Sequence, residues 1–398
     1  AEPISDLAFL RKATIDFIGR IPSVAEVEDF QSWPSMNRRR KLVDKLAKEP
    51  RFNERWAVFF ADMLRIRSNV EGGRQMLAYV HRAIADGQPY DELVRELVSA
   101  NGKVGKNPAV GFVLGDDVDP MELAGATAQV FLGVRLQCAQ CHDHPYDDWK
   151  QKEFYELAGF FGKTKRMENR FAGSVYTTEG HDMAVLWPPE RDAAPQREPI
   201  SPRFPFELVQ FTEKPDYIER LEAKRRRPGA PSSGTARPAP GSDIEELLEI
   251  DTDLLGGDGL TTADLLKEVR KESAELEVGH DLYRPSELRA RLAKLVTDPR
   301  NPYFARAFTN RVWAELIGRG FVEPLDNFSD YNGIRAPQTL NYLAGEFVAS
   351  GYDLRSLLKT IALSDTYARG HLPAGATPEQ IEASESNFSA NRVRRMLA

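Results

Sequence analysis

The chain has little cysteine, no long apolar run and no excess of positive charge. Its 398 residues include two cysteines, so no third cysteine offers either of them another pairing. No run approaches the roughly 18 apolar residues that a membrane helix needs. The formal net charge of −7 argues against a nucleic-acid-binding protein. The short basic runs at 38–40 and 225–227 read as solvated faces or linker.

The sequence also begins without a recognisable signal peptide. Its start, Ala1-Glu2-Pro3, could follow a signal-peptide cleavage site after small residues, or it could be a boundary unrelated to processing. At the other end, residues 391–398 read as the opening of an amphipathic helix. We therefore expect the natural chain to continue and to carry further functional residues there.

Both cysteines lie in one short motif. Cys138 and Cys141 are separated by two residues and followed at once by His142, which is the c-type haem attachment pattern. Each thiol can add to one vinyl group at the porphyrin edge, while the neighbouring imidazole binds the iron. Iron in haem proteins is commonly held by a proximal histidine, so His142 is expected in that role.

Three other interpretations of the motif stay open. A redox or disulfide Cys-x-x-Cys pair usually opens a helix after a strand, and nothing near Cys138 has that pattern. A zinc site would use Cys138, Cys141, His142 and His144. Structural zinc usually takes its ligands from separated pairs, and four ligands within seven residues would struggle to surround a tetrahedron. The cysteines could also be structural and hold no cofactor.

An attached haem would have a second axial position. His144 is a poor candidate, because two residues span at most about 7 Å and cannot carry the backbone around the porphyrin. We expect it in a supporting role, such as a hydrogen bond to a propionate. Met183 and His181 are better candidates for a sixth ligand, followed by Met167 and Met121. An empty sixth position is equally compatible with the sequence and would favour peroxidase-like or gas-binding chemistry.

Hydrophobic periodicity predicts a mostly α protein with two helical domains. We expect an N-terminal helical domain over 1–165, with the motif on a loop between two apolar-rich helices. Residues 166–260 form an irregular segment with room for one small hairpin, and the Pro-, Gly- and Ser-rich stretch 225–242 reads as a flexible linker. Helical periodicity returns over 261–398, the C-terminal helical domain.

Several motifs resemble two known families. The N-terminal part carries four of them: Arg20-Ile-Pro-Ser-Val-Ala-Glu-Val-Glu, Phe52-Asn-Glu-Arg-Trp56, Pro89-Tyr-Asp-Glu-Leu-Val-Arg95 and the stretch from Phe131 through Cys138-Ala-Gln-Cys-His-Asp-His-Pro145. The C-terminal part carries another four: Asn301-Pro-Tyr-Phe-Ala-Arg, Asn310-Arg-Val-Trp313, Gly318-Arg-Gly-Phe-Val-Glu-Pro324 and Gly351-Tyr-Asp-Leu-Arg-Ser-Leu-Leu358.

These motifs are similar to the planctomycete domains of unknown function numbered 1549 and 1553, which often follow a planctomycete cytochrome c module. The resemblance implies an exported bacterial protein linked to c-type haem, and it implies no particular reaction. It also implies a C-terminal region longer than the one present, and no cytochrome module precedes the match here.

The leading hypothesis is an exported, periplasmic or cell-surface protein that binds haem c and passes electrons to a redox partner protein. Covalent haem attachment normally occurs outside the cytoplasm, which is why export is expected. The alternative is a helical surface scaffold that binds carbohydrate or protein, with zinc or nothing in the motif. A hydrolase using Asp143, Asp147 or Asp148 beside the two histidines is a third hypothesis.

Overall fold

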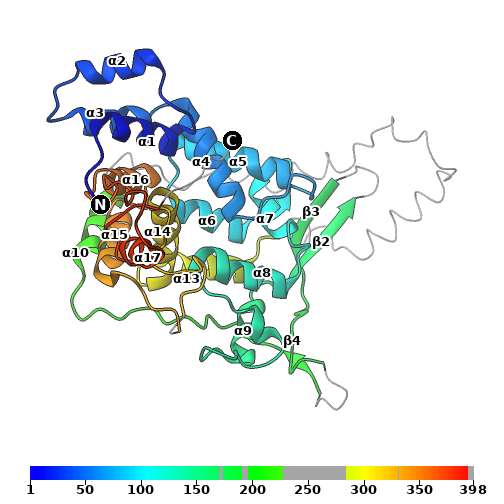
Figure 1. Cartoon of the computed structure of the whole chain (residues 1–398). Coiled ribbons are helices and arrows are strands. Elements are labelled where there is room, and N and C mark those ends of the chain that lie inside the picture. The colour runs from blue at the N-terminus through cyan, green and yellow to red at the C-terminus, as the bar shows by residue number, and fades with distance from the viewer. Residues whose placement is uncertain (170–173, 191–195, 227–283, 330, 393–398) are drawn as a thin grey trace, which may run out of the picture.

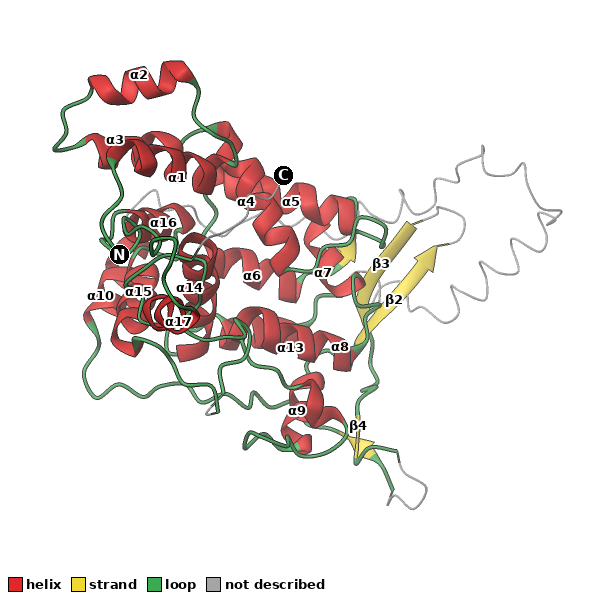
Figure 2. Ribbon diagram, in the orientation of Figure 1, coloured by secondary structure: helices red, strands yellow, loops and turns green. Residues whose placement is uncertain are grey.

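The computed structural model describes residues 1–169, 174–190, 196–226, 284–329 and 331–392. Helices make up most of this part, and the strands are short and peripheral (Figures 1 and 2). The predicted mostly α fold with an irregular middle segment is thus confirmed. Among the described residues, no helix is long and apolar enough to cross a membrane.

The first hundred residues form six helices, most of which begin at a polar or proline cap. In α2 the capping residue is Ser23, whose hydroxyl accepts a hydrogen bond from the Glu26 amide, and the Glu26 carboxylate accepts one in return from the Ser23 amide. Gly19 ends α1 in the left-handed conformation. The helices are α1 (Asp6–Ile18), α2 (Val24–Ser32), α3 (Arg38–Leu46), α4 (Pro50–Met63), α5 (Gly73–Asp86) and α6 (Tyr90–Ser99).

The next segment leads to the cysteine motif. Asp119 caps α8 by accepting hydrogen bonds from two backbone amides, and Pro120 occupies the first helical position. This helix passes directly into a π-helical turn that ends at Gly133. The elements here are β1 (Gly102–Lys103), η1 (Pro108–Val110), α7 (Gly111–Leu114), α8 (Pro120–Thr127), the π turn η2 (Ala128–Leu132), the 3₁₀ turn η3 (Gln137–Gln140) and α9 (Gln151–Ala158).

The middle segment contains the predicted hairpin. Strands β2 (Thr164–Asn169) and β3 (Ser174–Glu179) pair antiparallel, with Thr164 opposite Glu179, and β1 pairs with the other edge of β3. A second small pair joins β4 (Leu186–Trp187) to β5 (Glu198–Pro199). Helix α10 (Asp216–Arg225) follows. From residue 227 onward the predicted linker lies outside the described residues.

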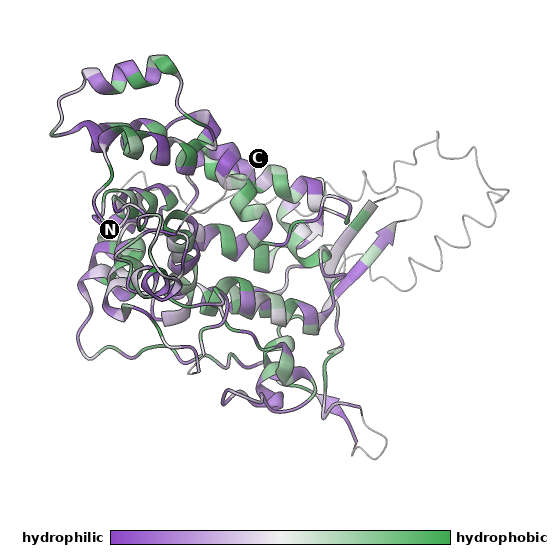
Figure 3. Cartoon of the chain, in the orientation of Figure 1, coloured by the Kyte–Doolittle hydropathy of each residue, from purple (hydrophilic) through white to green (hydrophobic). Residues whose placement is uncertain are grey.

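The C-terminal helices pack directly on the N-terminal ones. In Figure 1 the orange and red helices lie beneath the blue ones, and in Figure 3 the helices mix hydrophobic and hydrophilic stretches, as expected where each has one buried face. These helices are α13 (Glu287–Val296), α14 (Pro302–Ile317), α15 (Pro337–Ala349), α16 (Leu354–Ala362) and α17 (Pro378–Ser386).

Buried residues from both helical regions belong to one hydrophobic core. At its centre Tyr90 of α6 stacks on Phe308 of α14, with ring centroids 3.9 Å apart, and on Phe304 at 5.1 Å. Phe60 of α4 lies 5.7 Å from Phe308. Aromatic burial of this kind is a large stabilising contribution. The two regions therefore share their interior, while the domain boundaries drawn from the sequence stay a prediction.

A buried arginine connects the same two regions through polar contacts. Arg289 on α13 is completely buried and donates hydrogen bonds to the carbonyls of Val98 at 3.0 Å and Ala100 at 2.7 Å, and to the Thr164 hydroxyl at 2.9 Å. Burial lowers the pKa of Arg289 to about 10, opposed by the charge of Glu179. A buried charge is tolerated only when its donors are paired, so these contacts fix α13 against the end of α6.

We expect Arg289→Leu to destabilise the protein by about 3 kcal/mol, because it leaves two buried backbone carbonyls without donors. Urea unfolding followed by circular dichroism measures this free energy. Lys294→Leu on the exposed side of the same helix is the matched control and should change stability by no more than about 0.5 kcal/mol. Equal effects of the two substitutions would contradict the role given to Arg289.

Candidate functional site

The cysteine motif begins at a close crossing of the two helical regions. Gly133 has φ +68°, and its carbonyl accepts a hydrogen bond of 2.7 Å from the amide of Phe328. A Cβ at this position would lie 2.8 Å from the Phe328 ring and 3.1 Å from Ala307. Glycine is therefore required here both by the backbone conformation and by the contact.

The two cysteines lie at the turn η3. Cys138 is within it and Cys141 is its C-terminal cap, three positions later, which is the repeat of a regular 3₁₀ helix. Ala139 between them is buried, and its amide donates to the carbonyl of buried Leu136 at 2.8 Å. The apolar side of the turn thus faces the core. Both thiols are exposed, and neither is in a disulfide.

His142 follows with a defined tautomer. Its Nδ1 lies 2.6 Å from the backbone carbonyl of Asp143. A carbonyl oxygen can only accept, so Nδ1 carries a proton, and in the neutral ring Nε2 is the nitrogen with the lone pair. The side chain is exposed. A hydrogen bond from one ring nitrogen to a backbone carbonyl is the usual way in which a ligating histidine is oriented.

His144 is bound differently. Its Nδ1 accepts hydrogen bonds from the amides of Tyr146 at 3.3 Å and Asp147 at 3.0 Å, so this nitrogen is occupied. Its own amide donates to the Trp149 carbonyl at 2.8 Å, and the Asp147 carboxylate lies 3.7 Å from the ring. The imidazole therefore closes the loop after the motif. The hydrogen bond to a propionate expected from the sequence stays a prediction.

Asp143 ties the motif to the start of α9. Its Oδ1 accepts a hydrogen bond of 2.9 Å from the Gln151 amide, and Lys150 Nζ lies 3.3 Å from Oδ2. The side chain of Gln151 donates in turn to the Gln140 carbonyl at 2.9 Å. The hydrogen bond from Gln151, followed by that from Lys150, lowers the pKa of Asp143. A carboxyl group held ionised in this way is a poor proton donor for the hydrolase hypothesis.

The candidate sixth ligands lie elsewhere. Met183 packs against Gly162, and the neighbouring amide of Ala184 donates to the Gly162 carbonyl at 2.7 Å. Gly162 follows the C-terminal end of α9, whereas the motif contacts the N-terminal end of this helix. Because α9 has eight residues, its two ends are about 12 Å apart. Met183 and the motif therefore contact opposite ends of α9, and the role of Met183 as a sixth ligand stays a prediction.

The other candidates are also on separate elements. His181 is exposed and precedes Met183 by two residues, on the segment that follows β3. Met167 lies in β2 opposite Tyr176. Met121 is in the first turn of α8, a helix whose Gly125 lies against Gln137 of η3.

The zinc alternative lacks a preformed site. Within the ranges that the structure describes, no three side chains of His, Cys, Asp or Glu are grouped so that they could hold one metal ion. A zinc site at Cys138, Cys141, His142 and His144 would also have to displace the backbone amides from His144 if it used Nδ1. This alternative remains a prediction that requires a rearranged loop.

A polar cluster that the sequence did not reveal joins the motif to the C-terminal region. Gln137 donates to the side-chain oxygen of Gln129 at 3.0 Å, and Gln129 donates to Asp326 at 2.5 Å. Arg135 donates to the other oxygen of Asp326 at 2.6 Å. Asp326 comes almost two hundred residues after the motif, so spacing along the chain could not have identified it.

Two aromatic rings near the motif also come from the two regions. Tyr146 and Tyr331 are strongly exposed, with 73% and 79% of their surface accessible, and their ring centroids lie 6.0 Å apart. Exposed aromatic rings of this kind are common where a protein meets a partner or ligand.

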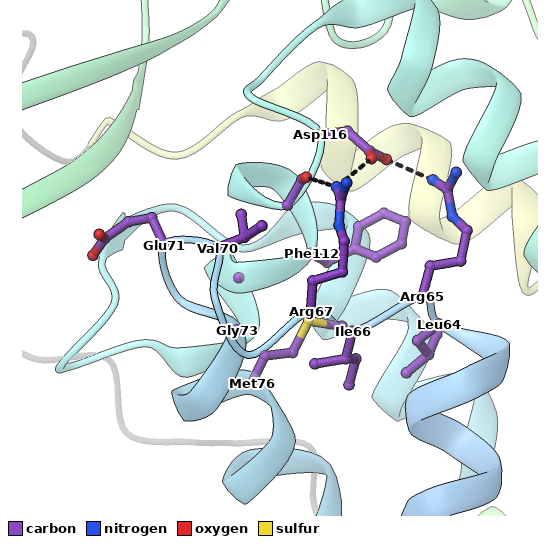
Figure 4. Close-up of a pocket in the computed structure, with 12 residues that line it drawn as sticks. Leu64, Arg65, Ile66, Arg67, Val70, Glu71, Gly73, Met76, Phe112 and Asp116 are labelled. Carbon is purple, nitrogen blue, oxygen red and sulfur yellow. Dashed lines mark hydrogen bonds and ion pairs between the residues drawn. The ribbon is translucent and has the colours of Figure 1, made fainter.

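A separate hollow lies between α5 and α7 (Figure 4). Arg65 and Arg67 reach the carboxylate of Asp116 from the same side, at 2.6 and 3.4 Å, while Glu71 points away. The space inside the hollow is only about 20 Å³, enough for one water molecule. The two arginines and Asp116 satisfy one another, so we interpret the hollow as a structural junction.

Two family models match the chain. Residues 1–166 match PSCyt2, a protein of unknown function (DUF1549), and residues 288–398 match PSD1, a protein of unknown function (DUF1553). These are the two families that the sequence motifs indicated, so the resemblance is confirmed. No curated protein and no solved structure matches the chain. The motif lies in the first matched region, and Asp326 and Tyr331 lie in the second.

The contact between Asp143 and Gln151 should depend on pH. The lowered pKa of Asp143 means that this contact stabilises the fold above the ordinary value of 3.8 and is lost as pH falls through the lower folded value. We expect the Gln151 amide resonance to titrate with a midpoint below 3.8 in nuclear magnetic resonance spectra. Asp143→Asn, which keeps an acceptor oxygen but cannot ionise, should remove that titration. A midpoint at or above 3.8 would contradict the assignment.

Proposed function

The chain joins a DUF1549 region to a DUF1553 region, two families of unknown function, and we propose that it is an exported c-type haem protein that exchanges electrons with a partner protein. In this proposal Cys138 and Cys141 anchor the haem, and His142 binds its iron. The printed family name PSCyt2 is consistent with a cytochrome association but states no activity.

One observation carries the proposal, namely the hydrogen bond from His142 Nδ1 to the Asp143 carbonyl. It leaves Nε2 as the nitrogen with a lone pair, which is what an axial ligand requires. The two thiols are exposed, one in the adjoining turn and one at its C-terminal cap. Attachment of a porphyrin edge needs this combination of two accessible thiols and one oriented imidazole within a single turn.

The attachment chemistry needs no residue outside the motif. At each cysteine the S–H bond adds across one vinyl double bond, so that sulfur bonds to one carbon and the hydrogen goes to the other. When bound, the haem would supply reversible one-electron chemistry at its iron. The chain fastens the motif through Asp143, Gln151 and His144, which form hydrogen bonds with the backbone of the same loop and of the start of α9.

The exposure of the motif supports exchange with a partner protein. The two thiols and the imidazole of His142 are all on the surface. Tyr146, which follows in the same loop, and Tyr331, whose ring lies 6.0 Å from that of Tyr146, are exposed as well. A group attached here would be accessible from outside. Because such attachment takes place outside the cytoplasm, the proposal also requires export, to the periplasm or the cell surface.

Cys138→Ala combined with Cys141→Ala should abolish covalent haem attachment, because no other thiol is present in the chain. The protein is exported from cells that can attach haem, denatured and examined by its absorbance in alkaline pyridine with reductant. The unsubstituted chain should show a c-type band that stays with the polypeptide. Asp148→Asn, an exposed change in the same loop, is the control and should retain the band.

Two results would overturn the proposal. Retained covalent haem in the double variant would place the attachment elsewhere. No band from the unsubstituted chain would remove the haem function, and the helical scaffold that binds a surface partner would then become the leading hypothesis.

Variants of the proposed sixth ligands should have little effect. Because Met183 lies at the far end of α9, we expect Met183→Leu and His181→Ala to leave the haem absorbance spectrum unchanged in both oxidation states. A change in the ligand-sensitive bands of either variant would show that the segment moves to the iron.

A further inference from the structure

A second hollow lies on the seam, by which we mean the surface where the matched region 1–166 packs against the matched region 288–398. It is a cleft of about 390 Å³ bounded by α4 on one side and by α14 and the segment 318–325 on the other. This volume is within the usual range for small-molecule sites, which is 300–1,000 Å³. Its apolar wall is formed by Phe59, Met63, Ala314 and Leu325.

Arg311 on α14 is one of the charged residues that line this cleft. Its Nη2 donates to the backbone carbonyl of Gln129 at 2.9 Å. Its Nε is buried and has no hydrogen-bond partner among the described residues. No described carboxylate forms an ion pair with it. Asp326, the acidic group that acts on it most strongly, is already bound by Gln129 and Arg135.

The surroundings of Arg311 make this arrangement costly. Burial lowers the pKa of Arg311, against the opposing effects of Asp326 and Tyr90. The hydroxyl of Tyr90 is also buried without a hydrogen-bond partner among the described residues, and the charge of Arg311 acts on it. A buried donor such as the Nε of Arg311 is unfavourable without an acceptor, and an anion close to the guanidinium would offset part of that cost.

The acidic groups at the cleft are already paired or exposed. Arg55 forms an ion pair with Glu315, and Arg319 lies 3.2 Å from Glu323. Asp62 on the rim is exposed, so water screens its charge. Arg311 therefore has no ion-pair partner among the described residues and lies beside an apolar wall.

We propose that this cleft binds a small organic carboxylate whose anionic group pairs with Arg311 and whose apolar part packs on Phe59, Met63 and Leu325. Arginine suits a carboxylate because its planar guanidinium presents two parallel donors to two oxygens. The site lies between residues of both families, so it exists only where the two regions are joined. It does not require haem.

Isothermal titration of the full chain with benzoate tests the site, with benzyl alcohol as a probe of the same shape without the charge. Benzoate should bind at millimolar concentration or below, and benzyl alcohol should bind more weakly. Arg311→Gln keeps an N–H donor near the Gln129 carbonyl but removes the charge. It should weaken benzoate binding by about tenfold or more, because a charge-assisted pair is lost, and leave benzyl alcohol binding unchanged.

Two further variants separate the binding site from general effects. Arg300 is an exposed arginine of the C-terminal region that pairs with Asp298. Arg300→Gln removes this charge and should leave benzoate binding unchanged. Ala314→Trp fills the cleft without altering Arg311 and should abolish binding, which keeps the test decisive if Arg311→Gln fails to fold. The proposal is overturned if benzoate does not bind, or if it binds Arg311→Gln or Ala314→Trp as well as the unsubstituted chain.

Discussion

The burial of Tyr90 against Phe304 and Phe308 is the contact on which the rest of the structure depends. It places aromatic rings from the N-terminal and C-terminal regions in one stack, with centroids as close as 3.9 Å. Arg355 strengthens the same seam by donating to the carbonyls of Ala47 and Ile84 and to the side chain of Asn53. Because the interior is shared, the cysteine loop and the cleft are each held by residues from both regions.

The seam also explains how an exposed motif can be well ordered. Gly133 accepts a hydrogen bond from Phe328, and Asp326 holds Gln129 and Arg135 on either side of the turn that leads to Cys138. On the other side, Gln151 and Asp143 fasten the motif to α9. An exposed loop loses much conformational entropy when it is ordered, and these contacts at both ends offset that cost. Preorganisation of this kind is what a ligand-binding turn requires.

Much of this organisation could be predicted from local patterns, because period and capping act over a few residues. The motif Cys138–His142, the helices around it and the hairpin in the middle segment all have such local signals. The tautomer of His142 could not be predicted, since it depends on the direction of one carbonyl. The distance between Met183 and the motif was also hidden, because the sequence does not say which end of α9 each segment meets. Asp326 and Arg311 became visible only when distant segments were brought together.

The π turn η2 connects the loop to the cleft. In a π turn the hydrogen bonds skip one residue further than in an α-helix, and here the amides of Gly133 and Val134 both reach the carbonyl of Ala128. The carbonyl of Gln129 is then available to Arg311, while its side chain holds Gln137 next to Cys138. A carboxylate bound to Arg311 would compete for donors with the Gln129 carbonyl and so act on the residue that positions the motif. Any such coupling has to be reciprocal, so a group bound at the cysteines would change affinity in the cleft by the same factor.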